Sequence, residues 1–305
     1  MSHATTAPTS KQEPFVTATP HAQNTVGGWP EPKQAQTHLG AIEYRDIGEG
    51  PVLVFLHLVL AEGSHWDAMP PLLADRFRCI IPNLPMGAHR IPANPNADLS
   101  AAGLALAVAQ LIEHLDASDV TLVGNDSGTA ISQVVAANHP ERLGRVVLTN
   151  GDMYGVFPPK MFMYFKALPY IPGGIALTAR LLRIRALWGL PFVFGLLTNK
   201  VDGSKIDRWV TAMLANKLVR RDVAKVIKGF GPKVSNQAAE TLRSTKLPFL
   251  LAWGANDKVF KPALAKRFCD KVPTAKLVMI EDCKTLVCWD QPKRLAELIA
   301  DFVPH

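Results

Sequence analysis

The chain lacks the features that mark disulfide-stabilised, membrane-spanning and secreted proteins. It has four cysteines in 305 residues, none of them in a Cys-x-x-Cys pair, and a chain of this length can bury a core without disulfides. We therefore expect reduced thiols at Cys79, Cys269, Cys283 and Cys288. No apolar run reaches the roughly 18 residues of a membrane span, and the N-terminus lacks the basic and then apolar pattern of a signal peptide. These absences predict a cytoplasmic protein.

The sequence also lacks a zinc-knuckle, an RNP-type or a helix-turn-helix signature, so binding to nucleic acid is not expected. Acidic residues are scarce in one region: residues 160–233 hold 14 Lys and Arg and only 3 Asp and Glu, a net charge of +11 in a chain whose total is +7. Such a region can attract anionic substrates or an anionic membrane through its long-range field. A solvated helical face is the simpler interpretation, so weak association with anionic membrane is the most that we expect.

What the chain does have is an alternation of short β-branched runs with longer helical patterns. Residues 1–36 are rich in Thr, Pro, Ala and Gln and predict a disordered tail, so the fold is expected to begin at Thr37. Strands are predicted at residues 41–47, 51–57, 77–84, 119–125, 142–150, 247–254 and 275–281. Helices are predicted at residues 66–75, 100–115, 127–138, 262–270 and 291–302. This order is typical of βαβ units and predicts an α/β fold with a mostly parallel sheet.

The alternation stops between residues 153 and 236. Phe, Met, Leu and Lys recur there at helical spacing between prolines, without a core strand pattern. We predict a helical cap at 153–236, inserted into a core formed by 37–152 and 237–305. The apolar segments "MFMYFKALPYIPGG" and "ALWGLPFVFGLL" predict a pocket for a hydrophobic substrate, although ordinary packing of the cap accounts for most of these side chains.

The order of the elements resembles the α/β-hydrolase fold. The resemblance rests on "VFLHLVLAEGSHW", "GNDSG", "LTN" before the cap and "AWGANDKVFKP", and it covers the chain from Thr37 to Val303. In that family a strand turns sharply into a helix at a nucleophile flanked by small residues, because a larger side chain would clash in the turn. The cap then follows the family's sixth strand. The resemblance implies a hydrolase that uses no cofactor and no metal.

The segment "GNDSG" contains two candidate nucleophiles, Asp126 and Ser127. The flanking glycines Gly124 and Gly128 place Asp126 at the apex, whereas a serine apex would need small residues where Asn and Thr stand. A carboxylate nucleophile attacks saturated carbon and forms an ester that water then cleaves. The chain thus resembles the branch of haloalkane dehalogenases and epoxide hydrolases. The alternative is that Asp126 only caps the following helix.

The residues for the second half of this reaction are incomplete. The resemblance implies that Asp257, in "WGANDKVF", is the acid that orients a histidine. The family's other acid position carries Asn150, and a turn-forming role for Asp257 stays open. The position of the histidine itself holds Thr285, which cannot take a proton from water. We expect the loop histidine His89 to be the best substitute base.

Other contacts of the family are partly present. Dehalogenases bind halide through a Trp after the nucleophile and an Asn past the strand-end histidine, but Ser127 and Val59 stand at these positions. A dehalogenase is therefore disfavoured. The backbone amides of Leu58 and Ser127 are expected to form an anion hole. Contacts to substrate are expected from three aromatic residues, Tyr154, Tyr164 and Trp66, although a cap tyrosine can equally pack with its hydroxyl in water.

These residues support three functions. The first is an atypical hydrolase that uses Asp126 against a hydrophobic small molecule such as an epoxide. The second is a cofactor-free lyase, isomerase or cyclase that uses Asp126 as an acid or base in the same pocket, which the missing histidine favours. The third is a ligand-binding protein that has lost turnover.

Overall fold

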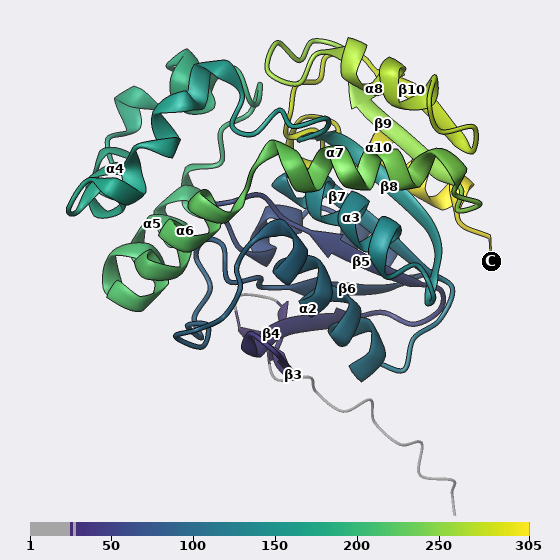
Figure 1. Ribbon diagram of the computed structural model, residues 1–305, viewed down its shortest axis with the longest axis horizontal. Coiled ribbons are helices and arrows are strands. Elements are labelled where there is room, and N and C mark those ends of the chain that lie inside the picture. The colour runs from purple at the N-terminus through teal and green to yellow at the C-terminus, as the bar shows by residue number, and fades with distance from the viewer. Residues whose placement is uncertain (1–24, 27–28, 305) are drawn as a thin grey trace, which may run out of the picture. The chain divides into compact units, whose positions relative to one another are not determined.

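The computed structural model describes residues 25–26 and 29–304 (Figure 1). The chain divides into two units, Met1–Glu31 and Pro32–His305. In the first unit the short strands β1 (Thr25–Val26) and β2 (Trp29–Pro30) pair antiparallel. The disordered tail expected at 1–36 falls largely outside the described residues, so that expectation stays a prediction for residues 1–24.

One eight-stranded sheet forms the core of the second unit. Along the sheet the strands follow the order β10-β9-β8-β7-β5-β6-β4-β3. The pairs β3·β4 and β4·β6 are antiparallel, and the other pairs are parallel. Their bounds are β3 Lys33–Thr37, β4 Gly40–Ile47, β5 Val52–Leu56, β6 Arg78–Pro82, β7 Val120–Asp126, β8 Leu143–Gly151, β9 Phe249–Gly254 and β10 Ala275–Ile280. The predicted α/β fold with a mostly parallel sheet is confirmed.

The sheet begins earlier than the expected start at Thr37. Strand β3 pairs with β4 along its whole length, and the side chain of Ala35 is fully buried. The sequence "KQAQT" offers one apolar residue among polar ones, so it does not show the apolar alternation by which strands are recognised. Tertiary pairing with β4 makes this segment a strand.

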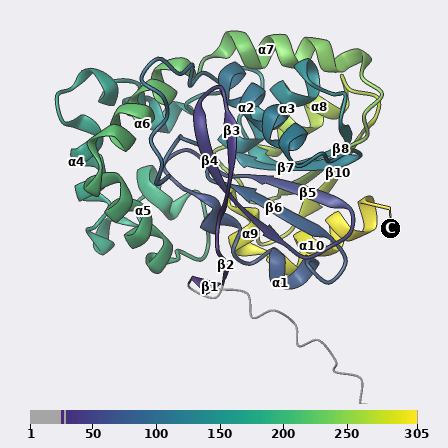
Figure 2. The ribbon, with the colours of Figure 1, turned by 90° about the horizontal axis from the view of Figure 1, so that it is seen from below.

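Helices cover both faces of the sheet, as Figure 2 shows. One face carries α2 (Ala101–His114), α3 (Ser127–Asn138), α7 (Pro232–Thr241) and α8 (Pro262–Cys269). The other carries α1 (Pro70–Leu73), α9 (Val287–Asp290) and α10 (Pro292–Phe302). Because both faces are covered, central strands such as β5 and β9 are buried and apolar along their length. The carboxyl ends of these strands are left to hold functional residues.

The cap lies between β8 and α7. Its helices are α4 (Gly174–Leu181), α5 (Gly203–Ala215) and α6 (Lys217–Gly229), preceded and joined by the short turns η2 (Lys160–Lys166), η3 (Leu168–Tyr170), η4 (Arg185–Leu187) and η5 (Pro191–Gly195). Helix α7 starts at Pro232 and packs along α3, so the cap ends before the expected limit at residue 236. None of the helices in the described parts of the chain is both long and apolar enough to cross a membrane.

Candidate active site

Asp126 stands at the turn from β7 into α3. Its backbone has φ 55 and ψ −119, a conformation that residues with a side chain rarely adopt. The turn is tight, since a Cβ on Gly124 would lie 2.5 Å from Ser132 Oγ and one on Gly128 would lie 2.0 Å from the Leu56 carbonyl oxygen. Both glycines are therefore required by space, and Asp126 rather than Ser127 occupies the apex.

Ser127 holds the Asp126 carboxylate. Its backbone N–H and its hydroxyl both donate to Oδ1 of Asp126, at 2.7 and 2.8 Å. Burial raises the pKa of Asp126, and these two donors act against that increase. An ordinary helix cap has extended backbone angles and bonds to the second or third helical N–H. Asp126 has neither property, so helix capping does not explain its position.

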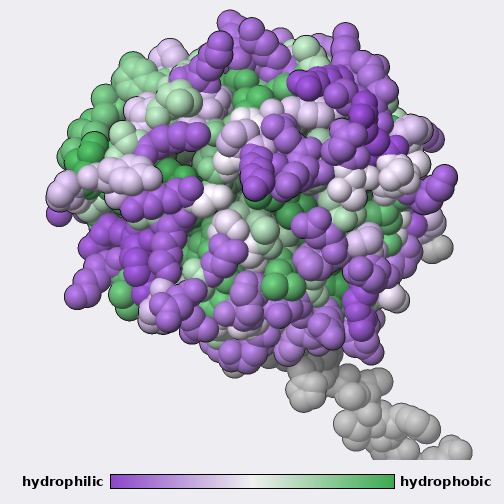
Figure 3. Space-filling model, in the orientation of Figure 1, coloured by the Kyte–Doolittle hydropathy of each residue, from purple (hydrophilic) through white to green (hydrophobic). Residues whose placement is uncertain are grey.

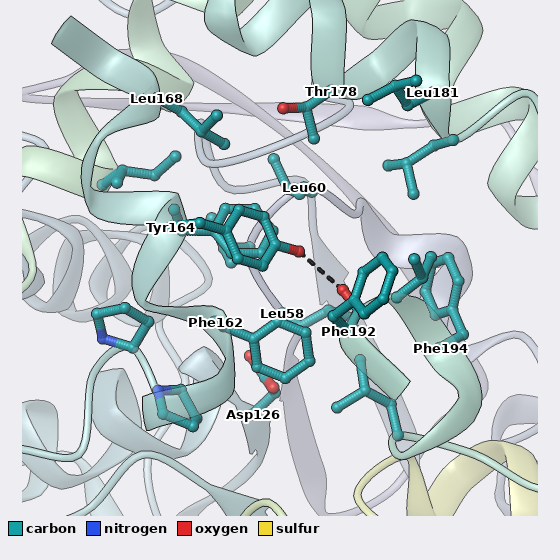
Figure 4. Close-up of a pocket in the computed structure, with 18 of the residues that line it drawn as sticks. Leu58, Leu60, Asp126, Phe162, Tyr164, Leu168, Thr178, Leu181, Phe192 and Phe194 are labelled. Carbon is teal, nitrogen blue, oxygen red and sulfur yellow. Dashed lines mark hydrogen bonds between the residues drawn. The ribbon is translucent and has the colours of Figure 1, made fainter. Parts of the chain in front are cut away.

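An apolar cavity of about 440 Å³ opens above Asp126, between the strand ends and the cap (Figure 4). Among the side chains that line it, ionisable groups come only from Asp126, Asp152 and Tyr164. The rest of the wall is almost entirely aliphatic or aromatic, with Phe162 directly over Asp126 in the view of Figure 4. The volume falls in the range of small-molecule sites.

Asp152 supplies a second carboxyl group to this cavity, and it is not among the site residues predicted from the sequence. It follows β8 directly, and its backbone N–H donates to the carbonyl oxygen of Asp126 at 3.2 Å. The residue is 2% exposed, and neither carboxyl oxygen has a hydrogen-bond partner among the described residues. Burial, followed by the charge of Asp126, raises the pKa of Asp152 well above its ordinary value. We therefore expect Asp152 to remain protonated at pH values at which Asp126 is already ionised.

The signal for Asp152 was present in the sequence. The segment "LTNGD" lies at the end of a strand next to the elbow strand, and the carboxyl ends of parallel strands meet at one edge. The position of the family's acid after this strand is occupied by Asn150. Two residues further along, the chain supplies a carboxyl group that enters the cavity instead.

Asp257 and Thr285 come together as the resemblance implies. Thr285 Oγ1 donates to Asp257 Oδ2 at 2.8 Å, and Asn150 Nδ2 donates to the same oxygen at 2.8 Å. Oδ1 of Asp257 accepts from the backbone N–H groups of Val259 and Phe260. Burial raises the pKa of Asp257 to about 6, although all of these donors oppose the increase. Asp257 and Thr285 do not line the cavity, so this cluster is an interior network behind it.

None of the histidines in residues 29–304 lines the cavity. His89, the expected substitute, is 2% exposed and points Nε2 at Asp222 Oδ2 of α6, 3.4 Å away. It is not among the cavity-lining residues, because its loop is packed beneath α6. His57 Nε2 accepts from the Leu84 N–H, and its Nδ1 donates to the Leu58 carbonyl. Burial lowers the pKa of His57 to about 4, so this ring is a neutral structural element.

The three aromatic residues expected to contact substrate lie in different places. Tyr164 lines the cavity, and its hydroxyl donates to the carbonyl oxygen of Phe192 at 2.8 Å (Figure 4). Tyr154 lies outside the cavity, with its ring 4.2 Å from the guanidinium of Arg267. Trp66 is fully buried against Phe55 and also lies outside. The expectation is met in position by Tyr164 alone.

The two expected anion-hole donors flank Asp126. Leu58 lines the cavity, and the Ser127 N–H already bonds to Asp126 Oδ1. A main-chain donor bound to a carboxylate oxygen can stay bound when that oxygen becomes the carbonyl of an ester. The arrangement thus places one donor at the oxygen on which negative charge would develop.

Comparison with known proteins identifies the family. Residues 51–292 match the model of the alpha/beta hydrolase fold. A 2-hydroxy-6-oxononadienedioate/2-hydroxy-6-oxononatrienedioate hydrolase of Paraburkholderia xenovorans (strain LB400) is 25% identical over 276 residues, which cover 87% of this chain and 91% of that protein. Haloalkane dehalogenase 2 of Mycobacterium tuberculosis (strain ATCC 25618 / H37Rv) is 27% identical over 269 residues, which cover 86% of this chain and 91% of that protein.

A solved structure shares the fold. The epoxide hydrolase CorEH without ligand matches with a TM-score of 0.71 at 16% identity, over 89% of this chain and 98% of that one. The expected hydrolase fold and an enzyme of this superfamily are confirmed. The match to the family model contains the elbow, the cap and the Asp257 loop, and the chain belongs to the alpha/beta hydrolase fold family.

Proposed function

We propose that this protein is a hydrolase in which Asp126 attacks an electrophilic carbon of a hydrophobic small molecule, with an epoxide as the best match. The observation that carries the proposal is the pair of carboxyl groups, Asp126 and Asp152, in an otherwise apolar cavity. Two carboxyl groups in unlike environments can divide the work of a nucleophile and a proton donor.

The environments assign the two roles. Asp126 Oδ1 receives two hydrogen bonds from Ser127, which favour its ionised form. Asp152 has no donor among the described residues, so its charged form is the more costly of the two. Asp126 is therefore the nucleophile and Asp152 the acid.

The first step opens the epoxide. Oδ1 of Asp126 is held by Ser127, so Oδ2 forms the new C–O bond while the C–O bond of the epoxide breaks. Asp152 gives its proton to the oxygen that is released. The products are an alkyl ester on Asp126, a hydroxyl group on the substrate and an ionised Asp152. Tyr164, whose hydroxyl is already bonded to Phe192, is not needed as the acid.

The second step hydrolyses the ester. Ionised Asp152 takes a proton from water, and the hydroxide attacks the ester carbonyl of Asp126. The Ser127 and Leu58 amides stabilise the oxyanion, and its collapse breaks the ester bond and expels an alkoxide. Asp152 gives its proton to this alkoxide, so that the diol leaves and Asp126 remains as the carboxylic acid. The proton of Asp126 then passes to Asp152, which restores the nucleophile and the acid for the next cycle. In this scheme Asp152 acts as the base in place of the family's histidine, whose sequence position is occupied by Thr285.

The relatives support this chemistry in part. A haloalkane dehalogenase is among the curated relatives, and an epoxide hydrolase is among the structural neighbours. The positions of the side-chain halide donors hold Ser127 and Val59, so an epoxide, which needs a proton donor instead, suits the cavity better than an alkyl halide.

A second candidate rests on the absence of histidine from the residues that line the cavity. Asp126 and Asp152 can also act as base and acid in a cofactor-free isomerisation or cyclisation without a covalent intermediate. The two candidates differ in whether an ester forms on Asp126.

The test is incubation with a panel of hydrophobic epoxides in ¹⁸O water, followed by intact mass spectrometry of the protein and the product. The proposal expects a diol product, label in Asp126 after a single turnover, and loss of activity in Asp126→Ala. Ser132→Ala, which alters the same helix outside the cavity, is the matched control and should stay active. Product without any label in Asp126 would support the second candidate and overturn the first.

A further inference from the structure

The outer surface of the cap is unusual in its charge. Between Met153 and Val201 the sequence has six Lys and Arg and no Asp or Glu. All six of these cations are exposed: Lys160, Lys166, Arg180, Arg183, Arg185 and Lys200. Among the described residues only Arg185 has an ion-pair partner, Asp207. The segment therefore presents a nearly uncompensated positive charge to solvent.

The same segment exposes most of the large apolar side chains. Of 13 that are exposed in the described part of the chain, nine lie between Met161 and Phe192. Met163, Ile171 and Ile184 are each about half exposed, and Tyr170 is 73% exposed. We call this surface, from Met161 to Phe192, the cap face. Figure 3 shows it as a green area at the upper left, where Figure 1 places α4.

The cap face is continuous with the wall of the cavity. Tyr164, Leu177, Leu181 and Phe192 line the cavity and are also between 43% and 54% exposed. Exposed apolar side chains gathered in this way mark a surface that binds another apolar surface. The rim thus connects the outer surface with the site at Asp126.

Apolar side chains set among unpaired cations fit one class of partner. In a bilayer with anionic phospholipids, the acyl chains can contact the apolar side chains and the negative headgroups can pair with the cations. A second copy docking through the same face would bring two positive surfaces together, which charge repulsion opposes.

We infer that the cap face docks on the surface of an anionic phospholipid bilayer and takes hydrophobic substrate from the lipid into the cavity. Docking itself is independent of the chemistry, and only the delivery of substrate rests on the proposed function. Apolar molecules partition into the bilayer and are concentrated there. With the rim of the cavity docked on the bilayer, such a substrate can pass from the lipid into the cavity without crossing water.

The experiment is co-sedimentation of the full-length protein with vesicles of phosphatidylcholine alone or with a third of the lipid replaced by phosphatidylglycerol. Asp126→Ala is included, so that binding is measured without turnover. We expect binding to the anionic vesicles that is at least about tenfold stronger than to the neutral ones and that weakens with added salt.

Two pairs of variants separate charge from apolar contact. Arg180→Glu with Arg183→Glu, and Met163→Ser with Ile184→Ser, should each reduce binding to anionic vesicles about tenfold or more. The matched controls make the same kinds of substitution on exposed residues outside the cap face. Lys276→Glu with Lys293→Glu is the control for the charge reversal, and Leu72→Ser with Leu106→Ser is the control for the loss of apolar side chains. They should bind like the unmodified protein.

Equal binding to both vesicle types, no binding to either, or equal loss in the controls would overturn the inference. So would a stable dimer in sedimentation analysis that the Met163→Ser and Ile184→Ser changes dissociate. Vesicle binding by the unmodified protein, if that protein shows no epoxide chemistry, would support docking and reject the proposed function, so that the two can fail separately.

Discussion

The backbone N–H of Asp152 bonds to the carbonyl oxygen of Asp126 at 3.2 Å, and this contact fixes the spacing of two carboxyl groups in one apolar cavity. Both residues stand at the ends of adjacent parallel strands, β7 and β8. Their relative position is therefore set by the sheet rather than by a mobile loop. A pair held in this way is suited to passing a proton to and from the same reacting centre.

Replacing Asp152 by Asn tests its role. The amide has nearly the same shape but can neither donate an acidic proton nor act as a base, so we expect kcat for epoxide hydrolysis to fall by about 10²-fold to 10⁴-fold. The alkyl ester on Asp126 should persist long enough to be seen by mass spectrometry. An Asp152→Asn protein with unchanged kcat would exclude Asp152 from the chemistry.

A plot of kcat for epoxide hydrolysis against pH should be bell-shaped. Activity requires ionised Asp126, so it rises as the pH passes the pKa of the pair's first ionisation, and it requires protonated Asp152, so it falls as the pH passes the second. Burial raises the pKa of both residues above 3.8, and it raises the pKa of Asp152 more than that of Asp126. The measurement is kcat against pH. A profile that stays level at high pH would show that no protonated carboxyl is needed.

Stability should change with pH in a direction that the raised pKa of Asp152 fixes. The folded state holds this proton more tightly than the unfolded state, whose value is near 3.8. The free energy of unfolding therefore falls as the pH rises from that value toward the folded pKa. Asp152→Asn removes this loss, so the melting temperature of the variant should rise relative to that of the unmodified protein as the pH increases above the ordinary carboxyl value of 3.8. A constant difference would contradict the assignment.

Thr285 is expected to be structural. Thr285→Val removes the hydroxyl that donates to Asp257 and keeps the shape, so the buried carboxyl loses a partner at a cost of about 1–3 kcal/mol. Denaturant unfolding measures the loss, and kcat should change less than about threefold because the residue does not line the cavity. Thr121→Val is the matched control, since the buried Thr121 hydroxyl has no hydrogen-bond partner in the described part of the chain and its removal should cost little.

His89 is also expected to affect stability and not catalysis. His89→Gln should leave kcat within about threefold of the unmodified value, because the ring faces Asp222 and not the cavity. The same change should lower the melting temperature, since Asp222 on α6 loses a neighbour at 3.4 Å. If kcat instead collapsed while the melting temperature held, His89 would have to reach the site by a movement of its loop.

The sequence predicted the fold well because most strands here are buried on both faces and read as unbroken apolar runs. It failed at β3, where pairing with β4 overrides a polar sequence. It also identified the elbow apex, since the two glycines leave only one frame. It did not find Asp152, whose importance depends on a carboxyl group that accepts no hydrogen bond from any residue that the structure describes. Motif positions cannot report a missing hydrogen bond.

The same limit explains the misplaced histidine. Position in a loop suggested that His89 could reach the pocket mouth, but the side chain turns toward α6. Tyr154 likewise turns to Arg267. The direction of a loop side chain depends on partners far away in sequence, here 133 positions distant for His89 and Asp222, and such partners are not visible in local patterns.

The hydrogen bond from Tyr164 to Phe192 joins two cap segments across the rim of the cavity. Both side chains are about half exposed, so this single bond is open to competition from water and to a change of neighbours. When the bond opens, the two cap segments lose this link at the rim. The rim can therefore change its shape here, whereas Asp126 and Asp152 are positioned by the sheet.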